Sequence, residues 1–219
     1  SSGCAVNCRY CFRRHFPYSE NQNSRQQWRE ALQLIRDDKS IEEVILSGGD
    51  PLVATDEQLQ ALVAQIAGIA HVRRLRIHTR LPVVIPARIT DSLLDAITHP
   101  CLQTIVVIHC NHASEMDESV ASALAALRSR GITLLNQSVL LADINDTLEA
   151  QLALCQRLFA TGVLPYYLHL LDKVQGAAHF DVPEHHARML LEGLKARLPG
   201  YMVPRLVREV EGATSKVGL

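Results

Sequence analysis

The sequence lacks an excess of charge of either sign. Its 22 lysine and arginine residues stand against 23 aspartate and glutamate residues, which leaves a formal net charge of -1. A protein that recruits nucleic acid usually carries a basic field over at least one face. We therefore expect no nucleic acid partner.

Long apolar runs are also missing. No stretch approaches the roughly 18 consecutive apolar residues that a membrane span needs. The first residues, SSGCAVNCRY, lack the charged and apolar regions of a signal peptide. These absences predict a cytoplasmic protein with no membrane partner.

Cysteine is scarce for a disulfide-stabilised protein. The chain has six cysteines in 219 residues, and three of them, Cys101, Cys110 and Cys155, stand alone among apolar neighbours. A secreted disulfide framework is denser than this, so a reducing compartment fits better. No repeat, low-complexity tract or linker interrupts residues 1–219, which indicates one domain able to bury roughly 70% of its unfolded surface.

Apolar runs alternate with amphipathic stretches along the chain. Strands are expected at Val44–Ser47, Leu75–Thr79, Thr104–His109, Thr133–Val139, Leu164–Leu170 and Val203–Val207. Helices are expected at Ser24–Asp37, Asp56–Ala67, Thr90–Thr98, Ser114–Arg130, Thr147–Thr161 and Pro183–Leu198. Threonine N-caps and the glycines Gly131 and Gly162 at helix ends support these boundaries.

This order of elements predicts an α/β fold with a parallel sheet and outer helices. A complete eight-stranded barrel needs about 250 residues. We therefore expect a partial, open βα barrel of about six parallel strands, with a doubly wound sheet as the alternative. Because no strand precedes the first cysteines, we also expect that an N-terminal segment and a first strand are missing.

Three cysteines crowd into the stretch GCAVNCRYCFRRHF. Cys4, Cys8 and Cys11 have the spacing C-x3-C-x2-C, which lets three thiolates converge on one metal site from a single loop. Closed zinc and iron-sulfur sites normally take four protein ligands, so three leave an open position. A zinc site with His15 as the fourth ligand is the alternative.

The second motif is ILSGGDPL, residues 45–52. Gly48 and Gly49 lie at the carboxyl end of a predicted strand, where βα proteins bind ligands, and they expose backbone groups there. Asp50 adds an acceptor suited to an ammonium group.

CAVNCRYC followed by LSGGDPL resembles the radical S-adenosylmethionine superfamily. The resemblance implies that Cys4, Cys8 and Cys11 hold a 4Fe-4S cluster whose open iron binds S-adenosylmethionine. It also implies that Ser47, Gly48, Gly49 and Asp50 hold the methionine amino group, with Tyr10 in the cluster loop.

Further motifs narrow the resemblance: CRYCFRRHF, RLPVVIPARIT, LLNQSVLL, PYYLHLLDKVQGAAHF and GYMVPRLVRE. Together they resemble the lysine 2,3-aminomutase family, especially the branch that makes (R)-β-lysine for elongation factor P. That family converts L-lysine to β-lysine by radical chemistry with pyridoxal phosphate. The resemblance also implies a separate protein as the reductant, while homo-oligomerisation stays open.

Residue roles follow from the resemblance. Lys216, one of four lysines, matches the lysine that binds pyridoxal phosphate, and Arg13 matches the arginine that clamps the substrate carboxylate. Asp172 and Glu209 match the acids that hold the distant ammonium of lysine, and His109 and Gln137 match nucleotide or pyridoxal contacts. Two alternatives remain: an aminomutase for another amino acid, against which the two acids argue in the case of glutamate, and a zinc-stabilised binding protein.

Overall fold

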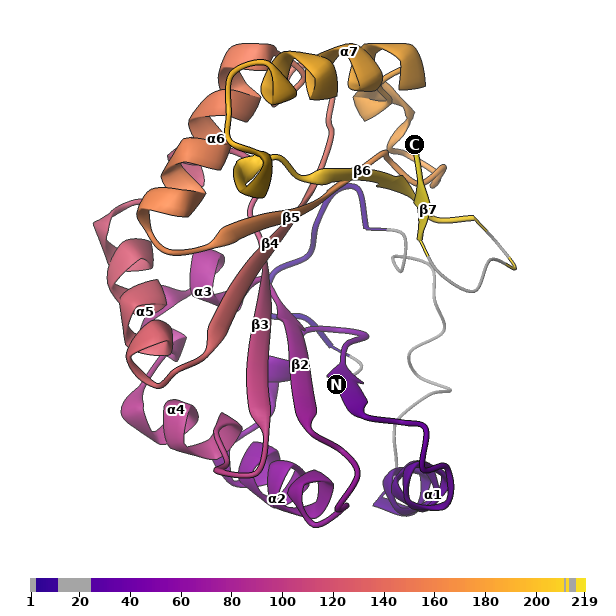
Figure 1. The fold of residues 1–219 in the computed structure, drawn as a ribbon, viewed down its shortest axis with the longest axis vertical. Helices are drawn as coiled ribbons and strands as arrows, with labels where there is room; N and C mark the ends of the chain where they lie inside the picture. Colours follow the sequence, from indigo (N-terminus) through magenta and orange to yellow (C-terminus); the bar gives the residue numbers. More distant parts are fainter. Residues whose placement is uncertain (1–2, 12–24, 211, 213–215) are drawn as a thin grey trace.

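One curved sheet organises the protein (Figure 1). The computed structural model describes residues 3–11, 25–210, 212 and 216–219. Its strands follow one another in chain order across the sheet: β1 (Glu43–Leu46), β2 (Arg74–Thr79), β3 (Gln103–His109), β4 (Thr133–Val139), β5 (Leu164–His169), β6 (Arg205–Arg208) and β7 (Val217–Gly218). Strands β1 to β6 are parallel, and β7 is antiparallel to β6.

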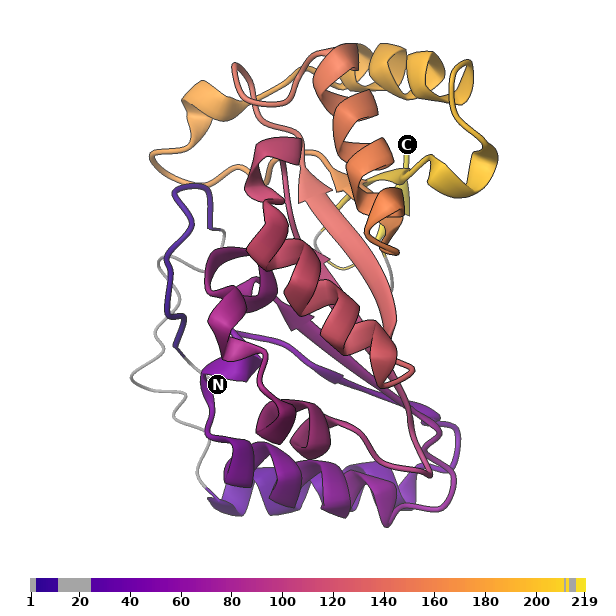
Figure 2. The same cartoon turned by 90° about the vertical axis from the view of Figure 1, so that its left-hand side faces the viewer.

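Helices cover the convex side of this sheet, with the first of them at the end near β1, and none of the described helices lies on the concave side (Figures 1 and 2). They are α1 (Arg25–Asp37), α2 (Asp56–Ala67), α3 (Leu81–Val84), α4 (Asp91–Ile97), α5 (Glu118–Ser129), α6 (Leu148–Ala160) and α7 (Glu184–Lys195). The expectation of an open βα barrel is therefore confirmed. Across the described residues, no helix combines the length and the apolar character that crossing a membrane requires.

Local sequence signals set most helix boundaries. The side chains of Thr55, Thr90 and Thr147 each accept a hydrogen bond from a backbone N–H three residues on, as N-caps do. Gly131 and Gly162 follow α5 and α6 with φ angles of 72° and 78°, which side chains with a Cβ rarely adopt.

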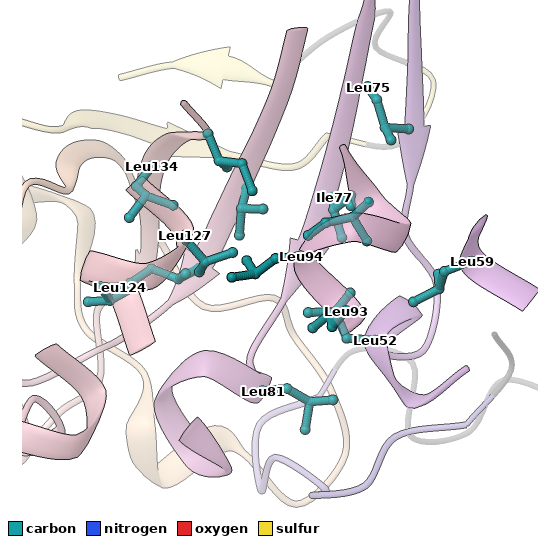
Figure 3. Packing of buried hydrophobic residues seen from close by; sticks show 14 of the residues in the cluster. Leu52, Leu59, Leu75, Ile77, Leu81, Leu93, Leu94, Leu124, Leu127 and Leu134 are labelled. Carbon is teal, nitrogen blue, oxygen red and sulfur yellow. The ribbon is translucent and has the colours of Figure 1, made fainter. Parts of the chain in front are cut away.

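The main core lies between the convex face and the helices. In β2, Leu75 and Ile77 are fully buried, while their neighbours in the strand face the concave side and are partly exposed. The two buried residues belong to the same cluster of buried side chains as Leu93 of α4 and Leu127 of α5 (Figure 3). Burying each such side chain contributes about 1.5–3 kcal/mol, so this layer holds the sheet in its curved shape.

Four features differ from the sequence-based expectation. Helix α3 lies in no predicted helix. The helix predicted over Ser114–Arg130 is divided into a 3-10 turn, η3 (Ala113–Glu115), and α5, because Asp117 caps α5 by accepting from Val120 N. The last parallel strand begins at Arg205 rather than Val203, after Pro204, which has no N–H to donate. Strand β7 has two residues, too few for a periodic pattern to predict it.

A bulge between β4 and β5 aims side chains at the concave face. Asn136 pairs with Pro165, but Gln137 pairs with Tyr167, so Tyr166 is an extra residue on β5. Because of this shift, Tyr167 and His169 lie on the same face as Gln137.

Candidate functional site

The cysteine loop, residues 3–11, docks on the turn that follows β1. Asp50 N donates to the Gly3 carbonyl over 2.9 Å. A Cβ on Gly49 would collide with that same oxygen, and Gly48 has a φ of 117°. Both glycines are therefore needed for the loop and the turn to approach each other this closely.

Three free thiols lie on this loop: Cys4, Cys8 and Cys11. Burial raises the pKa of Cys4, and a hydrogen bond with the Asp50 backbone lowers it. The charges of Asp50, Cys11 and Cys8 raise it further, which shows that the three cysteines are neighbours. In the described part of the chain, no three His, Cys, Asp or Glu side chains form a ready metal site. As a donor set, three unpaired thiols on one loop fit an iron-sulfur cluster, provided that the sulfurs draw together around it.

Tyr10 anchors the cysteine loop to the ends of β2 and β3. Its hydroxyl oxygen accepts hydrogen bonds from Arg80 Nη1 at 3.1 Å and from Asn111 Nδ2 at 2.5 Å. Burial raises the pKa of Tyr10 to about 12, although the charge of Arg80 opposes that rise. Farther along, the guanidinium of Arg9 lies 5.4 Å from the ring centroid of Phe180, which follows β5. The loop therefore runs along the edge of the sheet where the parallel strands have their carboxyl ends, which we call the carboxyl edge.

The Asp50 carboxylate already bonds to three groups of the protein. It is buried, with 7% of its surface exposed, and its carboxylate accepts from Leu52 N, Thr79 Oγ1 and Arg80 N at 3.1, 2.6 and 2.7 Å. These bonds join the turn after β1 to the end of β2. Ser47, directly after β1, is exposed. Roles for Ser47, the glycines and Asp50 in cofactor binding stay predictions.

His109 and Gln137 meet on the concave face at the ends of β3 and β4. Gln137 Nε2 lies 2.9 Å from His109 Nε2. Burial lowers the pKa of His109 to about 3, and the nearby charges of His78, Arg80, His169 and Lys216 lower it too. The imidazole is therefore neutral and accepts from the amide, while Gln137 Oε1 is buried with no hydrogen-bond partner in the described structure.

Lys216, Glu209 and Asp172 come together at the other end of this face, beside β5 and β6. Lys216 Nζ lies 2.5 Å from Glu209 Oε1 and 5.5 Å from the centroid of the Tyr167 ring. The hydrogen bond from Lys216 lowers the pKa of Glu209. Burial raises the pKa of Asp172, with a further rise from the charge of Glu209 and a decrease from Lys216.

Sequence reasoning did not single out His169, which ends β5 in the same corner. It is 8% exposed, and burial followed by the charge of Lys216 lowers its pKa to about 4. Its Nε2 has no hydrogen-bond partner among the described residues. Its position in PYYLHL would have indicated it, since the carboxyl ends of parallel strands are where ligands bind.

Two sequence-based assignments concern residues 12–24. Arg13, the expected carboxylate clamp, and His15, the alternative zinc ligand, both lie outside the described residues. Their roles stay predictions.

Comparison with known proteins decides the family. The family model described as the Radical SAM superfamily matches residues 1–150. The chain belongs to that superfamily.

Two similar proteins from different bacteria carry the same name. L-lysine 2,3-aminomutase of Escherichia coli (strain K12) is 53% identical over 217 residues, which cover 99% of this chain and 64% of that protein. The protein of the same name from Clostridium subterminale is 36% identical, over 97% of this chain and 51% of its own length. This chain therefore spans about half to two thirds of these relatives.

Two solved structures share the fold. Streptococcus suis SuiB bound to S-adenosylmethionine matches with a TM-score of 0.62 at 12% identity, over 96% of this chain and 49% of that one. A radical SAM methyltransferase from Sphaerobacter thermophilus matches with a TM-score of 0.58 at 15% identity, over 94% and 63% of the two chains. At these identities the likeness concerns the arrangement of the elements alone.

Proposed function

We propose that residues 1–219 form the catalytic domain of a lysine 2,3-aminomutase, an isomerase that converts L-lysine to β-lysine. The observation that carries this proposal is the corner formed by Lys216, Glu209 and Asp172. One lysine able to bind a carbonyl cofactor stands there beside two acids able to bind an ammonium group. The similarity to proteins named L-lysine 2,3-aminomutase supports the same reading.

Three groups of residues would hold the cofactors. Cys4, Cys8 and Cys11 would bind the cluster, and the turn from Ser47 to Asp50 would contact S-adenosylmethionine. His109 and Gln137 would contact S-adenosylmethionine or pyridoxal phosphate, and Lys216 would bind pyridoxal phosphate. When bound, the cluster with S-adenosylmethionine supplies a carbon radical, and pyridoxal phosphate supplies the conjugated group that lets nitrogen migrate.

The two acids would select the substrate by charge. An enclosed ammonium group costs several kcal/mol to desolvate unless carboxylates pair with it. Asp172 is half-buried, and Glu209 already pairs with the ammonium of Lys216. If Lys216 holds the cofactor in place of its pair with Glu209, Glu209 would be available to the side-chain ammonium of the substrate. At the other end of the substrate, Arg13 would bind the carboxylate with its planar fork.

The unpartnered polar atoms support an organic ligand in the concave face. Gln137 Oε1 and His169 Nε2 are buried, and no described residue bonds to them. Buried polar groups are almost always hydrogen-bonded. A polar ligand on this face would supply the missing partners, and the sheet would shield the reacting carbon from water.

The family resemblance suggests the wider setting. We propose that a separate reductant protein donates the electron and that the product is (R)-β-lysine, used to modify elongation factor P in the cytoplasm. These points depend on the resemblance and on no contact within the chain.

The test is the product formed from L-lysine by the full-length protein after anaerobic reconstitution with iron, sulfide, S-adenosylmethionine, pyridoxal phosphate and a chemical reductant. We expect β-lysine, with the (R) form identified by chiral chromatography. Turnover of glutamate or arginine in place of lysine would indicate a different aminomutase. A colourless protein that contains zinc would support the binding-protein alternative.

A further inference from the structure

Arg80, the first residue after β2, reaches the cysteine loop with its guanidinium. Nη1 donates to Cys8 Sγ over 3.0 Å and to the Tyr10 hydroxyl over 3.1 Å, while Nη2 donates to Glu115 Oε2 over 2.9 Å. One side chain thus joins a thiol of the three-cysteine motif, its neighbouring tyrosine and the turn after β3.

Arg80 is held in place through both its backbone and its guanidinium. Arg80 N donates to the buried Asp50 carboxylate over 2.7 Å. The second oxygen of Glu115 accepts hydrogen bonds from the backbone N–H groups of Asn111 and His112, at 2.7 and 2.9 Å. Glu115 therefore connects the guanidinium to the end of β3, so the direction of the bond to Cys8 is set by the sheet.

Arg88, an arginine with a purely structural role, serves as a comparison for Arg80. Arg88 pairs with Asp56 over 2.7 Å, and its Nε donates to the Leu52 carbonyl over 2.9 Å. The side chains of Arg80 and Arg88 are 21% and 22% exposed. Arg80 differs because it donates to a sulfur, and because its Nε is buried with no partner among the described residues. One of its donors, Nη1, is thus committed to the cysteine loop.

A hydrogen bond to a cluster sulfur has an electronic effect as well as a structural one. Hydrogen bonds to the sulfurs and the local net charge are among the factors that set the reduction potential of an iron-sulfur cluster. A cationic donor stabilises the reduced state more than the oxidised state, because the reduced cluster carries more negative charge. Lysine is a poor substitute, since a single ammonium lacks the planar fork that spans several acceptors.

We propose that Arg80 is a positioning residue for the cysteine loop, which fixes the Cys8 sulfur over the sheet and makes a cluster on that sulfur easier to reduce. This inference rests on the proposed function, because it requires a cluster on Cys4, Cys8 and Cys11. It goes beyond that function by naming a residue outside the loop that controls the electron-accepting step.

The experiment is a redox titration of the anaerobically reconstituted full-length protein, followed by the paramagnetic signal of the reduced cluster. We compare the parent with Arg80→Gln and with Arg88→Gln, the matched control. Arg80→Gln should lower the equilibrium constant for reduction about tenfold, which is about 59 mV for a one-electron couple. Arg88→Gln should leave the potential unchanged.

A second variant covers the case in which Arg80→Gln does not fold, as judged by circular dichroism. Arg80→Lys keeps the positive charge without the fork, and its potential should lie between those of the parent and the glutamine variant. Loss of iron from a folded Arg80 variant, with full iron in Arg88→Gln, also supports the proposal. Parental potential and iron content in the folded Arg80 variants overturn it.

The same measurement separates this inference from the proposed function. If the parent protein assembles no cluster, the proposed function itself fails. If the parent carries a reducible cluster and the Arg80 variants match it, only the role of Arg80 is rejected.

Discussion

The two halves of the carboxyl edge are built differently. At the ends of β1 to β3, polar side chains bond mainly to one another: the Asp50 carboxylate accepts three hydrogen bonds, and Arg80 links Cys8, Tyr10 and Glu115, although Arg80 Nε is buried with no partner among the described residues. At the ends of β4 and β5, Gln137 Oε1 and His169 Nε2 are buried without partners in the described part of the chain.

This difference teaches how one sheet can serve two kinds of ligand. A network that is already bonded supports a loop whose cysteines would bind an inorganic cluster, which needs a fixed scaffold. A set of unpartnered groups beside Lys216 suits an organic ligand that brings its own polar atoms. The following experiments test each half separately, beginning with the largest expected effect.

In the cysteine-loop half, Cys8→Ala should abolish the cluster. The remaining two thiols cannot replace the ligand that lies against Arg80. We expect the reconstituted variant to lose its visible absorption and its paramagnetic signal after reduction. Cys101→Ala, an exposed cysteine far from the loop in the sequence, is the control and should keep both. An intact signal in Cys8→Ala would remove the basis for the cluster assignment.

In the second half, Lys216→Ala should prevent covalent capture of pyridoxal phosphate. Borohydride reduction of the parent should attach the cofactor to the peptide that contains Lys216, detected by mass spectrometry. Lys195→Ala, which replaces a lysine paired with Glu192 on α7, should be labelled like the parent. Label on Lys173 or Lys195 in the parent would show that the assignment of Lys216 is wrong.

A smaller but more selective effect is expected for Asp172→Asn. Removing this charge should reduce kcat/KM for lysine. The loss should correspond to on the order of 2 to 5 kcal/mol of activation free energy, the range for breaking a buried charge pair. Cluster content and pyridoxal labelling should stay at the parental level, because neither cofactor needs that charge. Glu192→Gln, which changes an exposed acid of α7, is the control. Unchanged lysine turnover in both Asp172→Asn and Glu209→Gln would contradict the lysine assignment.

The smallest effect concerns stability and pH. Burial holds the pKa of His169 at about 4, below its ordinary value of 6.5. Between these values the unfolded chain binds a proton that the folded chain does not, so stability is full above pH 6.5 and declines as the pH falls toward 4. One such histidine contributes a slope of at most about 1.4 kcal/mol per pH unit.

Denaturant unfolding of the cluster-free protein at several pH values measures this slope. His169→Gln should flatten it, and the remaining slope should reflect His109, whose pKa is held lower still, at about 3, together with carboxylates such as Glu209 whose pKa is lowered. His185→Gln, which changes an exposed histidine on α7, should not alter it. Equal slopes in the parent and His169→Gln would show that His169 does not stay neutral in the folded protein.

Much of the fold was predictable because its signals are local. Thr55, Thr90 and Thr147 cap helices through bonds that span three residues. Leu75 and Ile77 alternate with polar residues over one strand. Such patterns depend only on backbone geometry over a few residues, so the six parallel strands were predicted to within two residues at each end, while α3 and β7 were not predicted.

The grouping of the site was predictable only in part. The motif Cys4, Cys8 and Cys11 is visible because its members share eight residues, and family resemblance named Lys216, Glu209 and Asp172 as one site. The bulge at Tyr166, which turns His169 toward that site, follows from the pairing of β4 with β5. No property of Tyr166 alone predicts it.

By itself, the sequence determined the order of the elements, the helix caps and the three-thiol motif, because each depends on residues close together in the chain. Only the tertiary structure decided that Arg80 bonds to Cys8, 72 residues away, and that Asn111 bonds to Tyr10, 101 residues away. Those bonds require the register of the parallel strands and the docking of the cysteine loop on Gly49. Both are set by packing between distant segments, and no local pattern records them.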